Sequence, residues 1–285
     1  GPNNEVNGLT LQGVGHGTTV EYVHVHNNLD DGVEWFGGTV NAKYLLLTGN
    51  DDDDIDFDEG YKGNIQYAII VKSQNLAPQG SNDPRGIEAN SSDADFVLET
   101  EATLANISII GGAVNNSAGA EQPGMRLRGA LTVSIFNTAV KAFDTGCIRI
   151  DDADTDGDST VDQFSQVSLT NVFGDCADGF YDKRDADNES NIGAQTITFD
   201  DAFAINEAFA TVPATSPTAT DNGSGFAFDT TTYVGAVAPG TAQASAWWAS
   251  WAIPTALLGT EQEMPAAASF VSCNDGTKQC TVTGT

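Results

Sequence analysis

A unit of strand, turn and strand recurs from residue 7 to about residue 200, and this repeat constrains the fold more than any other feature. The first strand alternates apolar and polar residues, as in TVEYVHVHNN at 19–28 and NIQYAIIVKSQ at 64–74. The second follows a turn and is usually announced by Gly, as in DGVEWFGG at 31–38 and GMRLRG at 124–129. Such a unit cannot bury its apolar face alone, so copies must stack. The sequence predicts an all-β parallel β-helix, right-handed because parallel crossovers generally are.

A β-sandwich is the competing interpretation, since it also contains short alternating strands at regular spacing. The Gly before the second strand returns in unit after unit, which a Greek key does not require. The 30 Gly and only 2 Met are typical of an all-β chain with many turns. These observations favour the solenoid.

Charge excludes several classes of function. The chain of 285 residues carries 11 Lys+Arg against 40 Asp+Glu, a net charge of −29. A nucleic-acid partner is excluded because a phosphate binder needs a basic surface. No apolar run approaches the ~20 residues of a membrane-spanning helix. The 40% hydrophobic residues, with 14 Phe, exceed what disordered segments carry, so we expect a folded core.

The repeat fades near residue 202. We therefore predict β-helix coils over 1–202 and an irregular, Ala, Thr and Pro-rich C-terminal cap region over 203–285, with a surface-hugging segment as the alternative. Three of the four Trp lie within 233–254. We expect their rings to seal the last coil, or else to form an exposed platform for sugars. The first coil, over 1–17, has no cap, which predicts either a fragment or an end covered by another chain or by the chain's own C-terminus.

Cysteine usage indicates an oxidising compartment. Four Cys in this chain fit an exported protein better than a cytosolic one. Cys273 and Cys280 bracket a turn-rich hexapeptide and predict a local disulfide loop, with metal ligation as the weaker alternative.

The sharpest local motif is DDADTDGDSTVD at 151–162. Its alternating carboxylates around Gly157 match an oxygen-ligand calcium loop, although an EF-hand would need Glu where Gln163 stands and flanking helices. The alternative is a solvated acidic turn. The calcium ligands predicted here are Asp152, Asp154, Asp156, Asp158 and Asp162.

A second acidic cluster lies in GNDDDDIDFDEG at 49–60. Alternation sends Ile55 and Phe57 inward, so Asp54, Asp56 and Asp58 are expected to share the outer face. Like charges at this spacing repel, and a divalent cation such as calcium would remove that penalty.

When the second strands of successive coils stack, the outward-facing residue of each strand lies above the outward-facing residue of the next. The resulting outward column reads Glu34, Asp56, Glu88, Arg126, Arg149. Adjacent coils lie about 4.8 Å apart, so Glu88 can pair with Arg126. The column is either a surface ion-pair ladder or a catalytic groove. In the groove, the two arginines would hold a uronate carboxylate while a neighbouring group abstracts a proton.

The stretches NNLDDGVEWFGGTVN and LTGNDDDDIDFDEGYKG, within 3–72, and YVGAV with a Trp-rich tail at 233–254 carry a resemblance. They resemble a family of largely uncharacterised exported β-helix proteins and lipoproteins of marine and other Gram-negative bacteria. The resemblance implies a pectate-lyase-like right-handed β-helix that is secreted or displayed on the outer membrane, with no established activity. One departure is that a stretch like SCNDGTKQCTVTGT precedes the solenoid in that family, whereas here it stands at 272–285.

These observations favour a non-enzymatic role. We predict an extracellular, calcium-stabilised cell-surface β-helix protein with a structural, adhesive or glycan-binding role. Its partners would be calcium ions, a cell-surface glycan, or a second copy in a surface layer that associates through the open first coil. The alternative is a polysaccharide lyase or glycoside hydrolase acting on a marine polysaccharide, which the net negative charge disfavours for anionic chains.

Overall fold

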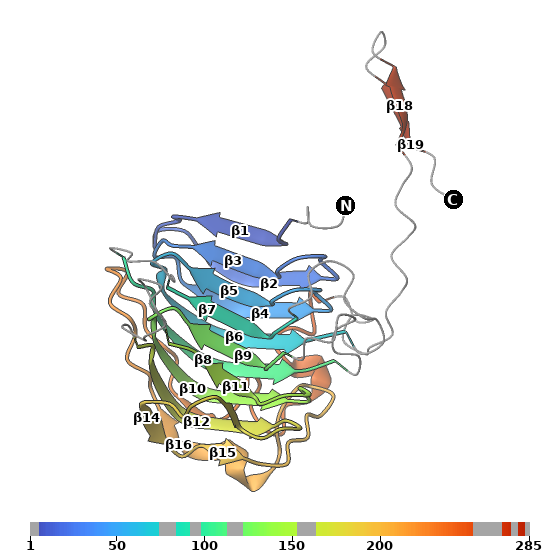
Figure 1. The fold of residues 1–285 in the computed structure, drawn as a ribbon. Coiled ribbons are helices and arrows are strands. Elements are labelled where there is room, and N and C mark those ends of the chain that lie inside the picture. The colour runs from blue at the N-terminus through green and yellow to red at the C-terminus, as the bar shows by residue number, and fades with distance from the viewer. Residues whose placement is uncertain are drawn as a thin grey trace.

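Parallel strands form two sheets that run along the length of the solenoid (Figure 1). The computed structural model describes residues 6–73, 84–91, 98–112, 122–152 and 164–252, and the backbone of 270–274 and 279–282. In each sheet, neighbours in space are alternate strands in sequence, because every coil contributes one strand to each sheet. The predicted parallel β-helix is confirmed.

The first sheet contains the short strands. Its order is β1 (Leu9–Gln12), β3 (Val33–Phe36), β5 (Ile55–Asp58), β7 (Ile87–Asn90), β9 (Met125–Arg128), β11 (Ile148–Ile150) and β13 (Tyr181–Asp182). The second sheet contains the longer strands. Its order is β2 (Val20–His26), β4 (Ala42–Thr48), β6 (Lys62–Val71), β8 (Glu101–Ile110), β10 (Thr132–Lys141), β12 (Gln166–Asp175) and β14 (Asn188–Ser190), with β15 (Gly193–Ala194) also on β12.

The period of two in the short strands builds the core. Every apolar residue that the alternation sends inward from β3 to β11 is at most 1% exposed. The residues between them face outward and are partly exposed. The predicted inward pairs are therefore confirmed: Val33 and Trp35, Ile55 and Phe57, Ile87 and Ala89, Met125 and Leu127, Ile148 and Ile150.

The longer strands bend at one equivalent position, where the residue takes a positive φ. Asn tolerates this left-handed conformation better than most residues, and the later coils use it. Asn171 donates to Asn137 Oδ1 at 2.8 Å, which continues the ladder between coils. In the first coils the rings of Tyr22, Tyr44 and Tyr67 stack instead, with centroids 4.5 and 5.0 Å apart. The left-handed residues are Tyr22, Tyr44, Tyr67, Asn106, Asn137, Asn171 and Asn191.

The segment 203–252 returns along the outer face of the second sheet. Its contacts run from β12, where Asn171 donates to Thr215, back to β6, where Gln66 donates to the Asp229 carbonyl at 3.0 Å. Of the two interpretations of this segment, the surface-hugging one describes these residues. It contains the 3₁₀ helices η1 (Ala208–Ala210) and η2 (Gln243–Ser245), and β16 (Thr211–Thr215) pairs antiparallel with β17 (Thr231–Tyr233).

The expectation that the Trp rings seal the last coil is wrong. Trp251 lies edge-on to Tyr22 of β2, and Trp247 lies 5.4 Å from Tyr44 of β4, both on the first coils. Trp248 is 4% exposed and packs against Phe203. The rings contact the tyrosines that replace asparagine in these coils, far along the chain from the Trp residues themselves.

Two further strands lie near the end of the chain. β18 (Phe270–Asn274) and β19 (Gln279–Val282) pair antiparallel. No helix among the described residues is long and apolar enough to cross a membrane.

Candidate metal centre

The outward column forms as predicted. The register of the first sheet places Glu34 beside Asp56, Asp56 beside Glu88, Glu88 beside Arg126, and Arg126 beside Arg149. These residues alternate with the buried apolar ones, so they share one face of the sheet. The column is acidic for three coils and basic for the next two.

The basic half of the column, Arg126 and Arg149, is neutralised within the protein. Their Nε atoms lie 3.1 and 3.0 Å from Asp151 Oδ2, and Lys183 also donates to this carboxylate. Arg126 lies 3.7 Å from Glu88, which confirms the predicted pairing. Burial alone would raise the pKa of Asp151, but the hydrogen bonds from Lys183 and Arg126 and the charge of Arg149 lower it. This arrangement is an ion-pair network.

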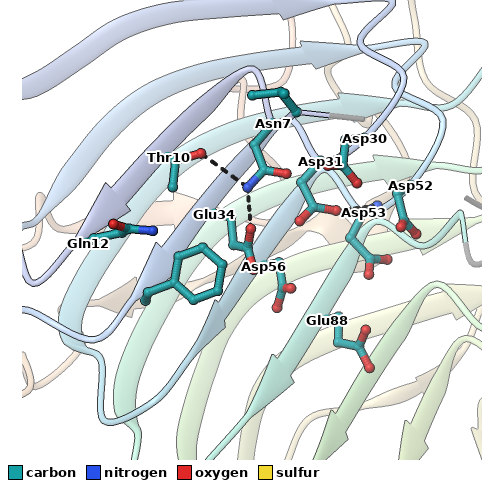
Figure 2. Close-up of a pocket in the computed structure, with 12 residues that line it drawn as sticks. Asn7, Thr10, Gln12, Asp30, Asp31, Glu34, Asp52, Asp53, Asp56 and Glu88 are labelled. Atoms are coloured by element: carbon teal, nitrogen blue, oxygen red, sulfur yellow. Dashed lines mark hydrogen bonds between the residues drawn. The ribbon is translucent and has the colours of Figure 1, made fainter. Parts of the chain in front are cut away.

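The acidic half lies beside a cavity of about 490 Å³. The turns that lead into β3 and β5 add two aspartates each, Asp30 and Asp31 from one turn and Asp52 and Asp53 from the next. Figure 2 shows these carboxylates with those of the column around the cavity. The wall is completed by Val6, Asn7, Thr10, Gln12 and Phe36.

The carboxylates fall into three triads within which the oxygens could bind one cation. The oxygens of each triad lie within 4.8 Å of one another. The triads are Asp30, Asp31 and Asp52; Asp31, Glu34 and Asp56; and Asp53, Asp56 and Glu88. Asp31 and Asp56 each belong to two triads, so the three form a continuous row along the sheet.

Burial and mutual repulsion act together on these groups. Burial, then the charges of Asp52 and Glu34, raise the pKa of Asp31 to about 8. Burial also raises the pKa of Glu34 to about 7, although a hydrogen bond from Asn7 opposes the shift. The pKa of Asp56 is raised well above its usual value by burial and by Asp31 and Glu88. A cation would lower all of these pKa values.

Asp56 has a buried carboxylate oxygen, Oδ1, that faces the cluster without a hydrogen-bond donor among the described residues. A buried carboxylate oxygen without a donor costs free energy and calls for an explanation, an ion among them. In Figure 2 the Asp56 carboxylate lies beside those of Asp31 and Glu34.

Comparison with known proteins gives the family. The model of the pectate-lyase-like beta helix domain matches residues 1–252. The chain belongs to this β-helix family. Neither a curated protein nor a solved structure matches it. The match shows the fold family, in agreement with the stacked parallel sheets, and leaves the role to be argued from the site.

Within this β-helix domain, the predicted ligands of the second cluster have different environments. Asp56 and Asp58 are partly exposed on the outward face of β5, as expected. Asp54 differs, because it has no exposed surface and its carboxylate lies 3.1 Å from Lys72 and accepts from Asn50. Of these three, only Asp56 belongs to a triad of the described residues.

The predicted calcium loop at 151–162 is described only at its start. Asp152 accepts hydrogen bonds at 2.9 Å from both the Ser165 amide and Arg184. The other ligands predicted there, Asp154, Asp156, Asp158 and Asp162, lie outside the described residues. That calcium site remains a prediction.

Four turn aspartates were not predicted as ligands: Asp30, Asp31, Asp52 and Asp53. The signal is in the sequence, because NNLDDG and GNDDDD precede register-paired strands. Aligning the turns as well as the strands would have placed these acids beside Glu34 and Asp56.

A disulfide joins Cys147 and Cys176, whose Cα atoms are 5.4 Å apart. This bond is consistent with a secreted or extracytoplasmic location. The sequence left these two cysteines unpaired and predicted a bond between Cys273 and Cys280. Those two are opposite one another in the β18–β19 register, and their bond remains a prediction.

Proposed function

We propose that this protein is an extracellular, calcium-stabilised β-helix that serves a structural, adhesive or glycan-binding role at a bacterial surface. The carrying observation is the row of three overlapping triads, two of which include Asp56, whose buried Oδ1 has no hydrogen-bond donor among the described residues. Seven carboxylates meet there: Asp30, Asp31, Glu34, Asp52, Asp53, Asp56 and Glu88. A bound cation converts this repulsive cluster into an attractive link between successive coils.

The donor set favours calcium over the other common divalent ions. All the donors are oxygens, whereas zinc and copper prefer nitrogen and sulfur donors. Calcium takes six to eight oxygens in flexible geometry, whereas magnesium demands a near-ideal octahedron. The cavity of about 490 Å³ leaves room for water to complete such a shell.

The test is thermal unfolding of the purified protein in saturating calcium and in excess chelator. Calcium at about a hundred times its Kd stabilises the folded state by about 2.7 kcal/mol. For a chain of this size that corresponds to a rise in Tm of roughly 4–7 °C. Equal Tm values in the two buffers would sink the proposal.

Two matched variants locate the effect. Asp56→Asn removes one charge from two triads and should abolish most of the calcium-dependent rise in Tm. Asp201→Asn removes an equal charge from an exposed position and should leave the rise unchanged. Equal responses of the two variants would attribute the effect to net charge alone.

The enzymatic alternative is a polysaccharide lyase or hydrolase on the outward column. The ion pairs of Arg126 and Arg149 with Asp151 count against it, because both guanidiniums already have a carboxylate partner. Incubation with alginate, pectin and neutral glycans, followed by assays for reducing ends and unsaturated products, distinguishes the two. Product formation would favour the enzyme, and binding without product would favour the glycan-binding role.

A further inference from the structure

Three residues occupy the same place in successive coils. Each lies two positions before the register-paired residues Val33, Ile55 and Ile87. The Asp53 amide donates to Asp31 Oδ1 at 3.0 Å, and one coil later the Arg85 amide donates to Asp53 Oδ1 at 3.0 Å. Asp31, Asp53 and Arg85 are therefore equivalent, and the coil of β7 has a cation where the coils of β3 and β5 have acids.

The guanidinium of Arg85 binds two carboxylates at this position of the repeat. Its side chain is 1% exposed, and Nη1 lies 2.8 Å from Glu88 Oε2 and 3.3 Å from Asp53 Oδ2. Nε donates to Gln122 at 2.9 Å. The positive charge thus lies between the turn acid of the preceding coil and the column acid of its own coil. In this coil the protein supplies its own cation.

One coil earlier the same two acids are Asp31 and Asp56. The residue equivalent to Arg85 there is Asp53, so the chain supplies a third acid and no guanidinium. Asp31 and Asp56 nevertheless come together with Glu34, their oxygens lying within 4.8 Å of one another. No ion pair within the described residues joins any of these three to a lysine or arginine.

We propose that a divalent cation binds between Asp31 and Asp56, with Glu34 as third ligand, in the place equivalent to that of the Arg85 guanidinium between Asp53 and Glu88. The unpartnered, buried Oδ1 of Asp56 is the independent observation that points to this ligand. Figure 2 shows Asp31, Glu34 and Asp56 grouped together, with Glu88 farther along the sheet. In both coils a positive charge then lies between the two acids, from the bound ion in one coil and from the guanidinium in the next.

Two consequences follow from this equivalence. The triad of Asp53, Asp56 and Glu88 takes no ion, because Arg85 already contacts two of its three carboxylates. Asp31 and Asp53, although equivalent in the repeat, have different roles: Asp31 binds the metal and Asp53 binds the guanidinium. The identity of the ion as calcium rests on the proposed function, whereas its place rests on the repeat.

The experiment compares calcium binding by wild type, Asp31→Asn and Asp53→Asn, measured by titration calorimetry after the chelator has been removed. Asp31→Asn should weaken calcium binding at least tenfold. Asp53→Asn should weaken it by a clearly smaller factor than Asp31→Asn, because it removes a charge of the cluster but no ligand of the ion, and it should lower Tm in chelator as well because Arg85 loses a partner. If Asp53→Asn does not fold, Glu88→Gln takes its place, because Glu88 is the other partner of Arg85.

The outcomes separate the two proposals. Equal weakening by the Asp31 and Asp53 variants, or greater weakening by the Asp53 or Glu88 variant, would overturn the placement while leaving calcium binding established. No heat of binding with the wild-type protein would instead refute the proposed function. A tenfold loss confined to the Asp31 variant would support both.

Discussion

The acidic and basic halves of the outward column both place like charges on neighbouring coils, but they differ in how those charges are balanced. Both consist of charged residues at equivalent positions on stacked strands, where neighbouring coils place like charges side by side. In the basic half, Asp151 lies between Arg126 and Arg149 and neutralises them from within the chain. In the acidic half, Glu34 and Asp56 meet further acids from the turns. The charges of the basic half are balanced within the chain, and we propose that a bound cation balances those of the acidic half.

The two halves of the solenoid also differ in how their coils are linked. The Cys147–Cys176 disulfide lies in the half of the solenoid that contains Arg149 and Asp151. The acidic triads lie in the coils that contain β3, β5 and β7. A covalent link therefore stabilises the later coils, and we propose that an ionic link stabilises the earlier ones. The two links should respond to different reagents.

The largest expected effect is loss of the disulfide. The bond closes a loop with a sequence separation of 29 residues, and the loop-entropy model gives about 3–4 kcal/mol for a loop of this length. The double variant Cys147→Ala, Cys176→Ala should lose about that much free energy of unfolding in urea titrations. Because the acidic half is untouched, the loss should be the same in calcium and in chelator. A loss that calcium abolishes would show that the two halves are coupled.

A smaller effect is expected when the centre of the basic half is removed. Asp151→Asn leaves Arg126, Arg149 and Lys183 without their shared carboxylate. We expect a loss of about 2 kcal/mol, because hydrogen bonds to charged groups contribute roughly 1.5–3 kcal/mol and these cations are partly exposed. Urea unfolding with and without calcium measures it.

The control for that variant is Asp182→Asn. Asp182 is 40% exposed and lies 3.8 Å from Arg149, so its removal should cost about 0–0.5 kcal/mol. Equal losses in the two variants would mean that Asp151 has no special place in the network.

The smallest expected effect is the pH dependence, which has opposite signs in the two halves. Burial raises the pKa of Asp31 to about 8 and that of Glu34 to about 7 in the folded protein. The folded state then binds more protons than the unfolded state, so stability without metal falls as pH rises from 5 to 8. The lowered pKa of Asp151 has the reverse effect: its contribution is present at neutral pH and is lost on strong acidification.

Urea midpoints between pH 5 and pH 8 test this sign. We expect a decline on the order of 1 kcal/mol in chelator after allowing for solvent screening, and a flat profile in calcium. A rise in stability with pH in chelator would contradict the account of the acidic half.

The sequence predicted the fold because the repeat is local. Gly before the second strand and alternation such as Val33 and Trp35 define both the strand and its inward face, and stacking follows because each coil has nowhere else to bury them. The sequence did not decide whether residues 203–252 form a cap or lie along the surface, because their path depends on contacts between residues far apart in the chain, such as Asn171 with Thr215. The same holds for the Trp rings, whose partners are tyrosines of the first coils.

The site was predicted only in part. The expected register of the stacked strands predicted the outward column of charged residues and the pairing of Glu88 with Arg126, because both follow from the period of two. The register did not predict that Asp31 and Asp53 join the site. Turn residues have no fixed period, and the distance of their side chains from the column depends on the path of the turn. Asp54 shows the converse limit: its parity predicts an outward position, but Lys72 from the end of the next strand pairs with it and buries it.

The most direct test of the central claim is an anomalous difference map from a crystal grown in calcium. We expect a peak about 2.3–2.6 Å from carboxylate oxygens of Asp31, Glu34 and Asp56, and none between Asp53 and Glu88, where Arg85 lies. A map at saturating calcium with no peak among Asp31, Glu34 and Asp56 would contradict it.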